Sequence, residues 1–479
     1  DRQRVVIVGG GFAGLNATRS LRRADVQVTL VDRRNFHLFQ PLLYQVATGG
    51  LSPGNIAAPL RSILRRQRNV EVLLAEVTDF DLAGRCLKLA DGELSYDTLI
   101  VCTGSQTGYF GRGEWAKAAP GLKSIEDALD IRHRILSAFE AAERETDPQR
   151  RREWLTFIII GAGPTGVELA GTLAEIASHT LKYDYRHINP ADARIVLVDL
   201  ADRVLGAFPP DLSAAAADRL RRMSIELRTS TRVQSLDEGS VILQPTAAEA
   251  KSETIAAHTI LWAAGVEASP LGRKLAVTSG CEIDRMGRLI VQPDLTLPNH
   301  PEVFVLGDLA HCADKQGKPL PGVAPTAIQQ GQYAARLIAA RLRGQSLPPF
   351  EYCDYGNMAT IGRSAAVAQL GRWKFTGFTA WLIWLFVHLM QLVRFENRIL
   401  VLIQWAWNYV TFNRSARLIT DVAVHRSDLL LTPLAPLGRG AGGEEPLLPS
   451  PTAGMIAVCG EVPNRRPDSP RPFGERGRG

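Results

Sequence analysis

The chain has 479 residues, of which 46% are hydrophobic and 22% are charged. This composition is typical of a globular protein of two or three domains and excludes a collagen, a disulfide scaffold or a wholly disordered chain. The formal net charge of +6 is too small to indicate a nucleic-acid partner. The six cysteines are scattered without a Cys-x-x-Cys pair, which argues against a zinc site and indicates a reducing compartment. A charged start runs directly into an apolar strand, so no secretory signal is expected.

Two stretches of the sequence share one pattern: an apolar strand, a glycine-rich turn, a helix, and a second strand that ends in an aspartate. The first stretch covers residues 4–32 and the second covers residues 155–199. Each reads as a βαβ unit, and such units form parallel sheets that bind dinucleotides at the turn. The repeat therefore predicts an α/β protein with two Rossmann-like, doubly wound dinucleotide-binding domains.

The first turn has the sequence G-x-G-x-x-G. Its members are Gly9, Gly10, Gly11, Phe12, Ala13 and Gly14. The first glycine permits the tight turn, the second lets the backbone approach a pyrophosphate, and the third lets the helix pack on the strand. Asp32 ends the next strand, where a carboxylate accepts hydrogen bonds from ribose hydroxyls.

The second turn repeats this chemistry with Gly161, Gly163, Pro164, Thr165 and Gly166. Asp199 is expected to bind the ribose hydroxyls of a nicotinamide nucleotide and to repel a 2′-phosphate, which favours NADH over NADPH. Arg203 leaves the alternative open, because a guanidinium could accept that phosphate.

Further apolar strands are predicted at 97–105, which contains Thr103-Gly104, at 259–266, and at 302–311, which contains Gly307-Asp308. Asp308 is placed to hold a ribityl hydroxyl of a flavin. A helix from Pro325 to its stop at Gly344 would aim its positive end at the flavin ring.

The C-terminal part begins with two apolar runs, residues 375–393 and 399–412. They admit three interpretations: two spanning helices, a buried subdomain, or amphipathic helices lying in a membrane surface. Monotopic attachment is favoured by aromatic and basic residues typical of a bilayer interface. These are Trp381, Trp384, Trp405, Trp407, Tyr409, Arg394, Arg398, Arg414 and Arg417. His388 is expected to pack rather than to bind a ligand, and the Pro- and Gly-rich stretch from Pro433 is expected to be disordered.

Together with these motifs, residues 37–53, 161–175, 320–335 and 356–368 resemble the type II NADH dehydrogenases, which are non-proton-pumping NADH:quinone oxidoreductases with FAD. The resemblance covers residues 4 to 420. It implies an FAD domain split between 1–115 and 271–350, an NADH domain at 116–270 and a membrane-anchoring segment at 351–420. The remaining residues, 421–479, are expected from their composition to form a disordered tail.

The resemblance also implies the role of each site residue. Gly161, Gly163, Thr165 and Asp199 would dock NADH over the flavin, with Ala264 and Gly265 lining the nicotinamide. The first turn, Thr103, Gly104, Gly307, Asp308 and Ala327 would hold FAD. Glu168 is either a catalytic group near both rings or a carboxylate favoured by the start of its helix.

For the quinone, the family motif places two glutamines four residues apart on one helix. Gln329 occupies the second position, Pro325 stands at the first, and Tyr355 and Met358 complete the expected quinone site. The stretch 35–51 has no cysteine, so a disulfide reductase is not expected.

The expected function is therefore electron transfer from NADH to a membrane quinone, with no metal. A reductase of a soluble electron carrier and a flavin-bearing NADH sensor remain the alternatives. The expected location is the cytoplasmic face of the cell inner membrane, on the lipid surface, with a possible homodimer.

Overall fold

The fold is that of a computed structural model that describes residues 2–247, 250–411, 414 and 416–419. These residues lie within one compact unit, Asp1–Ala423. The tail that the sequence predicts to be disordered lies outside the described residues.

The first sheet has six strands in the order β20-β21-β9-β1-β2-β5. All neighbours are parallel except β20 and β21. The strands are β1 (Gln3–Val8), β2 (Val26–Asp32), β5 (Val70–Leu74), β9 (Thr98–Val101), β20 (Thr296–Leu297) and β21 (His300–Val305). The sheet therefore joins strands from before and after the second βαβ unit.

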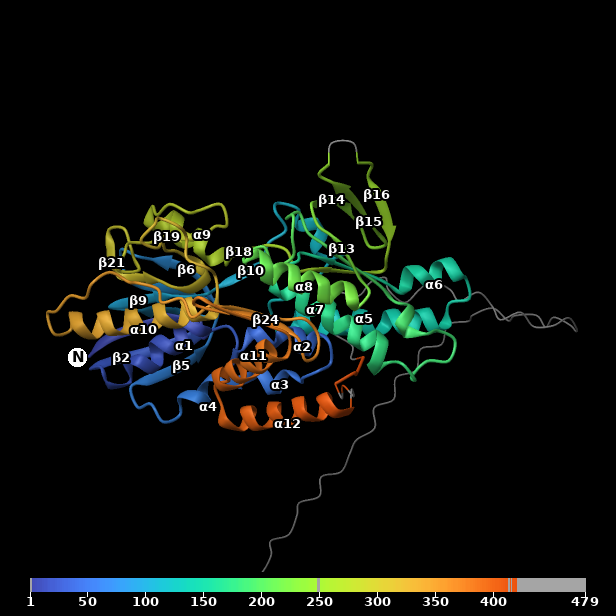
Figure 1. The fold of residues 1–479 in the computed structure, drawn as a ribbon. Coiled ribbons are helices and arrows are strands. Elements are labelled where there is room, and N and C mark those ends of the chain that lie inside the picture. Colours follow the sequence, from blue (N-terminus) through green and yellow to red (C-terminus); the bar gives the residue numbers. More distant parts are fainter. Residues whose placement is uncertain (1, 248–249, 412–413, 415, 420–479) are drawn as a thin grey trace, which may run out of the picture. The chain divides into compact units, whose positions relative to one another are not determined.

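Side-chain alternation along β1 gives this sheet two buried faces. Val5 and Ile7 pack with α1 (Phe12–Ser20) and α10 (Ala324–Arg341). Val6 and Val8 belong to the core under β6 (Val77–Asp81), β7 (Cys86–Leu89), β8 (Glu93–Ser95) and α9 (Pro270–Ser279). The layers that cover the sheet are visible in Figure 1.

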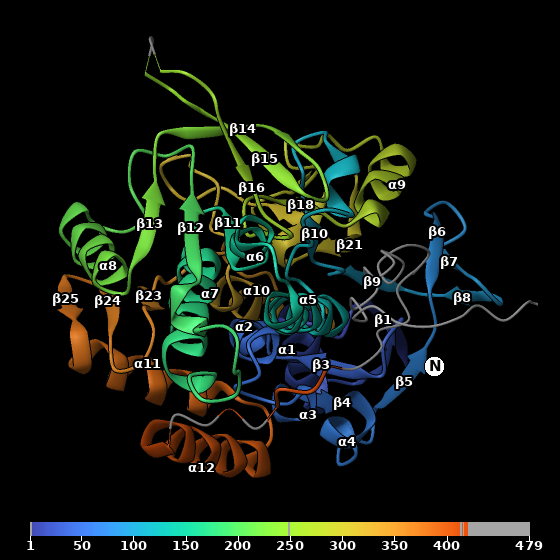
Figure 2. The same cartoon turned by 90° about the vertical axis from the view of Figure 1, so that its right-hand side faces the viewer.

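The second sheet has four parallel strands in the order β13-β12-β11-β17. They are β11 (Thr156–Ile160), β12 (Arg194–Val198), β13 (Ile225–Arg228) and β17 (Thr259–Trp262). Phe157 and Ile159 pack on α7 (Pro164–Glu175) and α8 (Pro210–Arg222). Ile158 and Ile160 face the meander β14 (Thr231–Leu236), β15 (Ser240–Pro245) and β16 (Glu253–Ala256), which Figure 2 shows away from α7 and α8.

Two short strands, β10 (Ser105–Thr107) and β18 (Val266–Ala268), pair antiparallel where the chain passes between the sheets. Longer connections carry α5 (Ile125–Arg144) and α6 (Pro148–Trp154). The remaining small elements are β3 (Phe36–Leu38), α2 (Leu43–Ala47), α3 (Pro53–Ile56), β4 (Ala57–Pro59), α4 (Leu60–Leu64), β19 (Leu289–Ile290) and β22 (Ala310–His311).

The described chain ends with an antiparallel sheet and two helices. The strands are β23 (Asn357–Thr360), β24 (Ala366–Leu370) and β25 (Trp373–Thr376), and the helices are α11 (Gly377–Gln391) and α12 (Phe395–Thr411). On α12 the buried residues Asn397, Val401 and Trp405 recur every fourth position, as one face of a helix requires. The α/β class with a C-terminal helical region, predicted from the sequence, is confirmed.

The opposite faces of α11 and α12 expose large apolar side chains. They are Phe378, Leu382, Phe386, Met390, Phe395, Ile399, Leu400, Leu402, Ile403, Trp407 and Val410. Within the described part of the chain, neither of these helices nor any other is both long and apolar enough to cross a bilayer.

The expectation for the interfacial aromatic and basic residues is only partly correct. Trp407 is exposed, whereas Trp384 and Trp405 are buried because they share the inner helix faces with Ala380 and Val401. Three of the four arginines expected at headgroups instead pair with carboxylates of the chain: Arg394 with Glu396, Arg414 with Glu175 and Arg417 with Asp184. His388 packs as expected, stacked on Trp384 with 4.3 Å between ring centroids.

Candidate functional site

The two glycine turns are built alike. Gly9 and Gly161 have φ angles of +107° and +106°, a region that glycine enters freely. A Cβ at Gly9 would lie 2.5 Å from the carbonyl oxygen of Cys102, and one at Gly161 would lie 2.6 Å from the backbone of Ala263. Both turns therefore require glycine, because each is pressed against the neighbouring strand.

The second glycine of each turn faces open space. A Cβ at Gly11 or Gly163 would meet no atom within 4 Å. These residues are the N-caps of α1 and α7, and neither helix start has a side-chain cap. The free amides and the partial positive charge of each helix start form a site for a phosphate group.

An aspartate at the end of the following strand is hydrogen-bonded to each turn. Asp32 Oδ2 accepts the amide of Gly10 at 2.5 Å, and Asp199 Oδ2 accepts the amide of Ala162 at 2.5 Å. Their other oxygens accept the amides of Arg34 at 2.7 Å and Ala201 at 2.8 Å. Burial raises the pKa of Asp32 above its usual value. Both carboxylates lie where the sequence predicts ribose contacts.

The flavin residues expected from distant parts of the sequence meet beside the first turn. A Cβ at Gly307 would lie 3.5 Å from the Cβ of Ala327 and 3.7 Å from the Cβ of Ala13. The amide of Gly307 donates to Oε1 of Gln330 at 2.6 Å, so Gln330 holds this turn from a buried position. Three segments of the chain thus converge on one place.

Asp308 and Thr103 supply the polar groups there. The Ser105 hydroxyl donates to Asp308 Oδ2 at 2.7 Å and itself accepts from Lys123 Nζ at 3.1 Å. The Thr103 hydroxyl is buried and has no hydrogen-bond partner among the described residues. A buried hydroxyl without a partner carries a penalty that a bound group would remove. These residues fit a flavin dinucleotide.

Glu168 lies on α7, two residues past the second turn, and is 9% exposed. Burial raises the pKa of its carboxyl group to about 8, and the amide of Thr360 donates to Oε1 at 3.5 Å. Near neutral pH the group is therefore mostly protonated and can release a proton.

The residues expected at the quinone end are placed as follows. The Gln329 amide is paired on both sides with the backbone of Cys353: Nε2 donates to the carbonyl at 2.8 Å, and Oε1 accepts the amide at 2.9 Å. Tyr355 is 63% exposed, and Met358 packs on the core that contains α7. The fold thus brings Gln329 to the segment that leads into β23.

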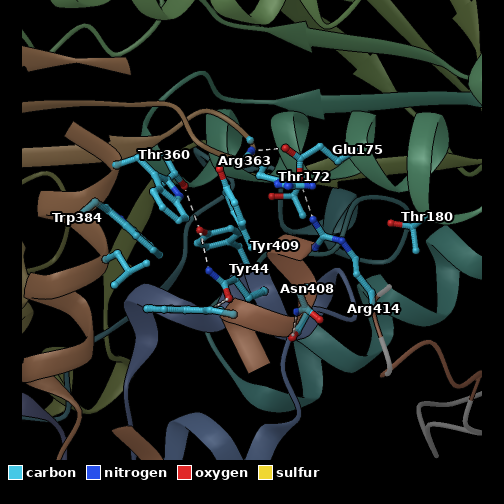
Figure 3. A pocket seen from close by; sticks show the side chains of 16 residues that line it. Tyr44, Thr172, Glu175, Thr180, Thr360, Arg363, Trp384, Asn408, Tyr409 and Arg414 are labelled. Carbon is cyan, nitrogen blue, oxygen red and sulfur yellow. Dashed lines mark hydrogen bonds and ion pairs between the residues drawn. The ribbon is translucent and has the colours of Figure 1, made fainter. Parts of the chain in front are cut away.

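A pocket of about 110 Å³ lies farther along β23, between α2, α7, α11 and α12 (Figure 3). It is lined by Tyr44, Gln45, Gly50, Thr172, Glu175, Thr180, Thr360, Gly362, Arg363, Trp381, Trp384, Leu385, Trp405, Asn408, Tyr409 and Arg414. Five of these residues are aromatic, and the pocket adjoins Thr360, which contacts Glu168. Its lining suits a flat, weakly polar ring.

Hydrogen bonds connect the polar lining of this pocket. Trp405 Nε1 donates to Gln45 Oε1 at 2.7 Å, and Gln45 Nε2 donates to the Tyr44 hydroxyl at 3.1 Å. The Tyr44 hydroxyl lies 3.0 Å from Thr360 Oγ1, and burial raises the pKa of Tyr44. Sequence reasoning gave Tyr44, Gln45 and Thr360 no role in a site and expected Trp405 at a bilayer interface. The available signal was a few polar side chains within the stretches 37–53 and 356–368, which resemble the family.

The cysteines Cys102 and Cys281 lie in the hydrophobic cores. Both are buried free thiols. The described residues contain no group of His, Cys, Asp and Glu that could hold a metal ion.

Comparison with known proteins gives a consistent result. The family model "Pyridine nucleotide-disulphide oxidoreductase" matches residues 3–331, and the "NDH2 C-terminal domain" matches residues 355–414. The chain is 47% identical to the type II NADH:quinone oxidoreductase Ndh of Mycobacterium tuberculosis over 88% of this chain and 91% of that protein. It is 46% identical to NdhA of the same organism over 92% of this chain and 94% of that protein.

Solved structures support the fold. An NDH2 structure from Plasmodium falciparum superposes with a TM-score of 0.79 at 21% identity, over 85% of this chain and 98% of that one. A sulfide:quinone oxidoreductase from Aquifex aeolicus superposes with a TM-score of 0.65 at 15% identity, over 86% of this chain and 92% of that one. With two matched glycine turns, a matched C-terminal region and relatives of this identity, the chain belongs to the type II NADH:quinone oxidoreductase family.

Proposed function

We propose that this protein transfers two electrons from NADH to a quinone through FAD, without pumping protons. The observation that carries the proposal is the pair of equivalent glycine turns on two parallel sheets. Each turn leads into a helix without a side-chain cap, and each is hydrogen-bonded to the aspartate at the end of the next strand. Such a pair provides for two dinucleotides in one chain. Held by the residues of the first turn, FAD would supply a two-electron carrier between the nicotinamide and the quinone.

The residues of the chain position and protonate the reactants. Gly161, Gly163, Thr165 and Asp199 hold NADH, and Ala264 with Gly265 lines its nicotinamide end. The first turn, Thr103, Gly104, Gly307, Asp308 and Ala327 hold FAD. This assignment divides the chain as the sequence predicts, with an FAD domain formed by 1–115 and 271–350 around an NADH domain at 116–270.

Reduction of a quinone to a quinol takes up two electrons and two protons. The hydride of NADH accounts for both electrons and one proton, so the second proton must come from water. Glu168 is the group that supplies it, because burial keeps its carboxyl group protonated near pH 7. On the quinone side, Gln329, Tyr355 and Met358 border one end of β23, and the aromatic pocket lies at the other. Glu168 contacts the strand between them through Thr360.

The quinone reaches the enzyme from a lipid surface. The exposed apolar faces of α11 and α12 rest on the membrane, in the segment 351–420, and place the pocket beside the lipid. The enzyme works peripherally at the cytoplasmic face of the inner membrane. A homodimer also remains a prediction, which light scattering of the purified protein would test.

The test is anaerobic stopped-flow mixing of the FAD-loaded protein with NADH and then with a short-chain quinone. Oxidised-flavin absorbance should bleach with NADH and return promptly with quinone, over many cycles. Bleaching without recovery would favour a soluble carrier as acceptor or an NADH-sensing role. Absence of bleaching would overturn the proposal.

A further inference from the structure

Phe110 occupies a turn position that does not suit a bulky residue. The amide of Arg112 donates to the carbonyl of Tyr109 at 2.9 Å, and the two central residues, Phe110 and Gly111, have φ angles of +51° and +83°. This pattern is that of a type I′ turn, whose central positions favour Asn, Asp and Gly. A phenylalanine there is strained.

The same residue is also poorly buried. Phe110 is 76% exposed, although it is a large apolar side chain. Its ring touches Gly265, where an added Cβ would lie 2.7 Å from Cζ, and its centroid is 6.1 Å from that of Trp262. The positive φ strains the backbone, and a side chain that stays exposed gains little hydrophobic free energy on folding to compensate.

The ring of this strained residue lies near the second glycine turn. Strands β11 and β17 are neighbours, with Ile160 paired to Trp262, so Gly161 and Gly265 lie at the same carboxyl edge. Ligands of parallel sheets bind at that edge. Phe110 therefore lies beside Gly265, the residue expected at the nicotinamide end of the bound NADH.

We propose that Phe110 is an aromatic wall of the nicotinamide subsite, covered when the dinucleotide binds. The inference rests on the proposed function, because it requires NADH at the second turn. The ring would pack against the nicotinamide base and exclude water from that end. The turn holds the side chain outward before the ligand arrives.

The test compares Phe110→Ala with the wild-type protein, both loaded with FAD and oxidised, by calorimetric titration with NAD⁺ and with ADP-ribose. One aromatic contact is worth a factor of about 3 to 10 in affinity. NAD⁺ should bind the variant more weakly by that factor. ADP-ribose lacks the nicotinamide and should bind both proteins equally. Unchanged NAD⁺ affinity, or an equal loss for ADP-ribose, would overturn the inference.

Two further variants separate ligand binding from folding. Phe110→Gly should lose the same NAD⁺ affinity without a lower melting temperature, because glycine suits the turn. A lower melting temperature with unchanged NAD⁺ affinity would assign the ring to folding and overturn the proposal. Tyr183→Ala removes another side chain of 76% exposure and should change neither affinity. If the wild-type protein binds neither ligand, the proposed function fails instead.

Discussion

Glu168 shows how position in the fold sets the chemistry of a residue. Its carboxyl group has an ordinary pKa of 4.5 in the unfolded chain and about 8 in the folded one, because burial disfavours the charge. From pH 4.5 to 8 the folded state keeps a proton that the unfolded state releases. The stability that this group contributes is present below pH 4.5 and is lost as the pH rises through 8.

Replacing Glu168 with Gln should remove this pH dependence. Urea unfolding at pH 5 and pH 8 should show the wild type losing stability relative to Glu168→Gln, with an upper bound of roughly 5 kcal/mol across the window. Quinone reduction by the wild type should also decline as the pH passes about 8. Equal stability changes in the two proteins would mean that Glu168 ionises normally.

Asp199 is expected to decide between the two nicotinamide nucleotides, because its charge repels a 2′-phosphate. Replacing it with Ser should reduce the NADH-over-NADPH ratio of kcat/KM by about tenfold, measured at constant salt. Asp199→Asn is the matched control, since it removes the charge and keeps an oxygen for the Ala162 amide. An unchanged ratio in both variants would remove Asp199 from the specificity argument.

At the scale of elements, an ion pair ties the end of the described chain to α7. Arg414, which follows α12, lies 3.0 Å from Glu175, and their side chains are 14% and 15% exposed. Burial lowers the pKa of Arg414, and Glu175 opposes that shift. The backbone carbonyl of Gly49 accepts the amide of Ala416 at 3.3 Å, so the segment also lies against α2.

Removing one charge of this pair should leave the other buried and uncompensated. We expect Glu175→Gln to lower the free energy of unfolding by about 3 kcal/mol. The glutamine oxygen still accepts the Arg363 amide, so the change isolates the charge. Asp211→Asn breaks the exposed pair with Lys374, whose side chains are 58% and 42% exposed, and should cost less than about 1 kcal/mol. Similar losses for both would contradict a special role for the buried pair.

The outer face of α12 gives a test of membrane attachment. Ile403 is 61% exposed, and placing a carboxylate there should weaken sedimentation with vesicles that contain anionic lipid by about tenfold or more. Val277→Glu is the control, because Val277 is 85% exposed but lies on α9, away from the C-terminal helices. Equal vesicle binding by Ile403→Glu and the wild type would argue against membrane attachment through this face of α12.

At the scale of the whole molecule, oxidation of NADH and reduction of quinone use different parts of the chain and should be separable. Gln329→Leu should lower quinone turnover about tenfold or more while leaving the rate of flavin bleaching by NADH nearly unchanged, as stopped-flow would show. Gln329→Glu keeps an acceptor for the Cys353 amide. Comparing its quinone turnover with that of Gln329→Leu shows how much of the loss comes from breaking this hydrogen bond. Slower bleaching in Gln329→Leu would place this residue on the NADH side instead.

The sequence by itself determined the two glycine turns, the aspartates that follow them and the alternating strands. These features are local: a G-x-G-x-x-G turn and the acid after the next strand lie within one βαβ unit, and no distant residue changes their meaning. The family followed from longer stretches of sequence, residues 37–53, 161–175, 320–335 and 356–368. The two βαβ units and the later strands β9, β17 and β21 could therefore be predicted before any contact between them was known.

Only the tertiary structure decided which side chains those elements bring together. Trp384 and Trp405 are buried, and Arg414 forms an ion pair with Glu175. Both outcomes depend on partners that are far away in the sequence. The pKa of Glu168, the pairing of Gln329 with Cys353 and the aromatic pocket arise in the same way. Burial and desolvation are properties of the assembled environment, and a single sequence does not contain them until the chain has folded.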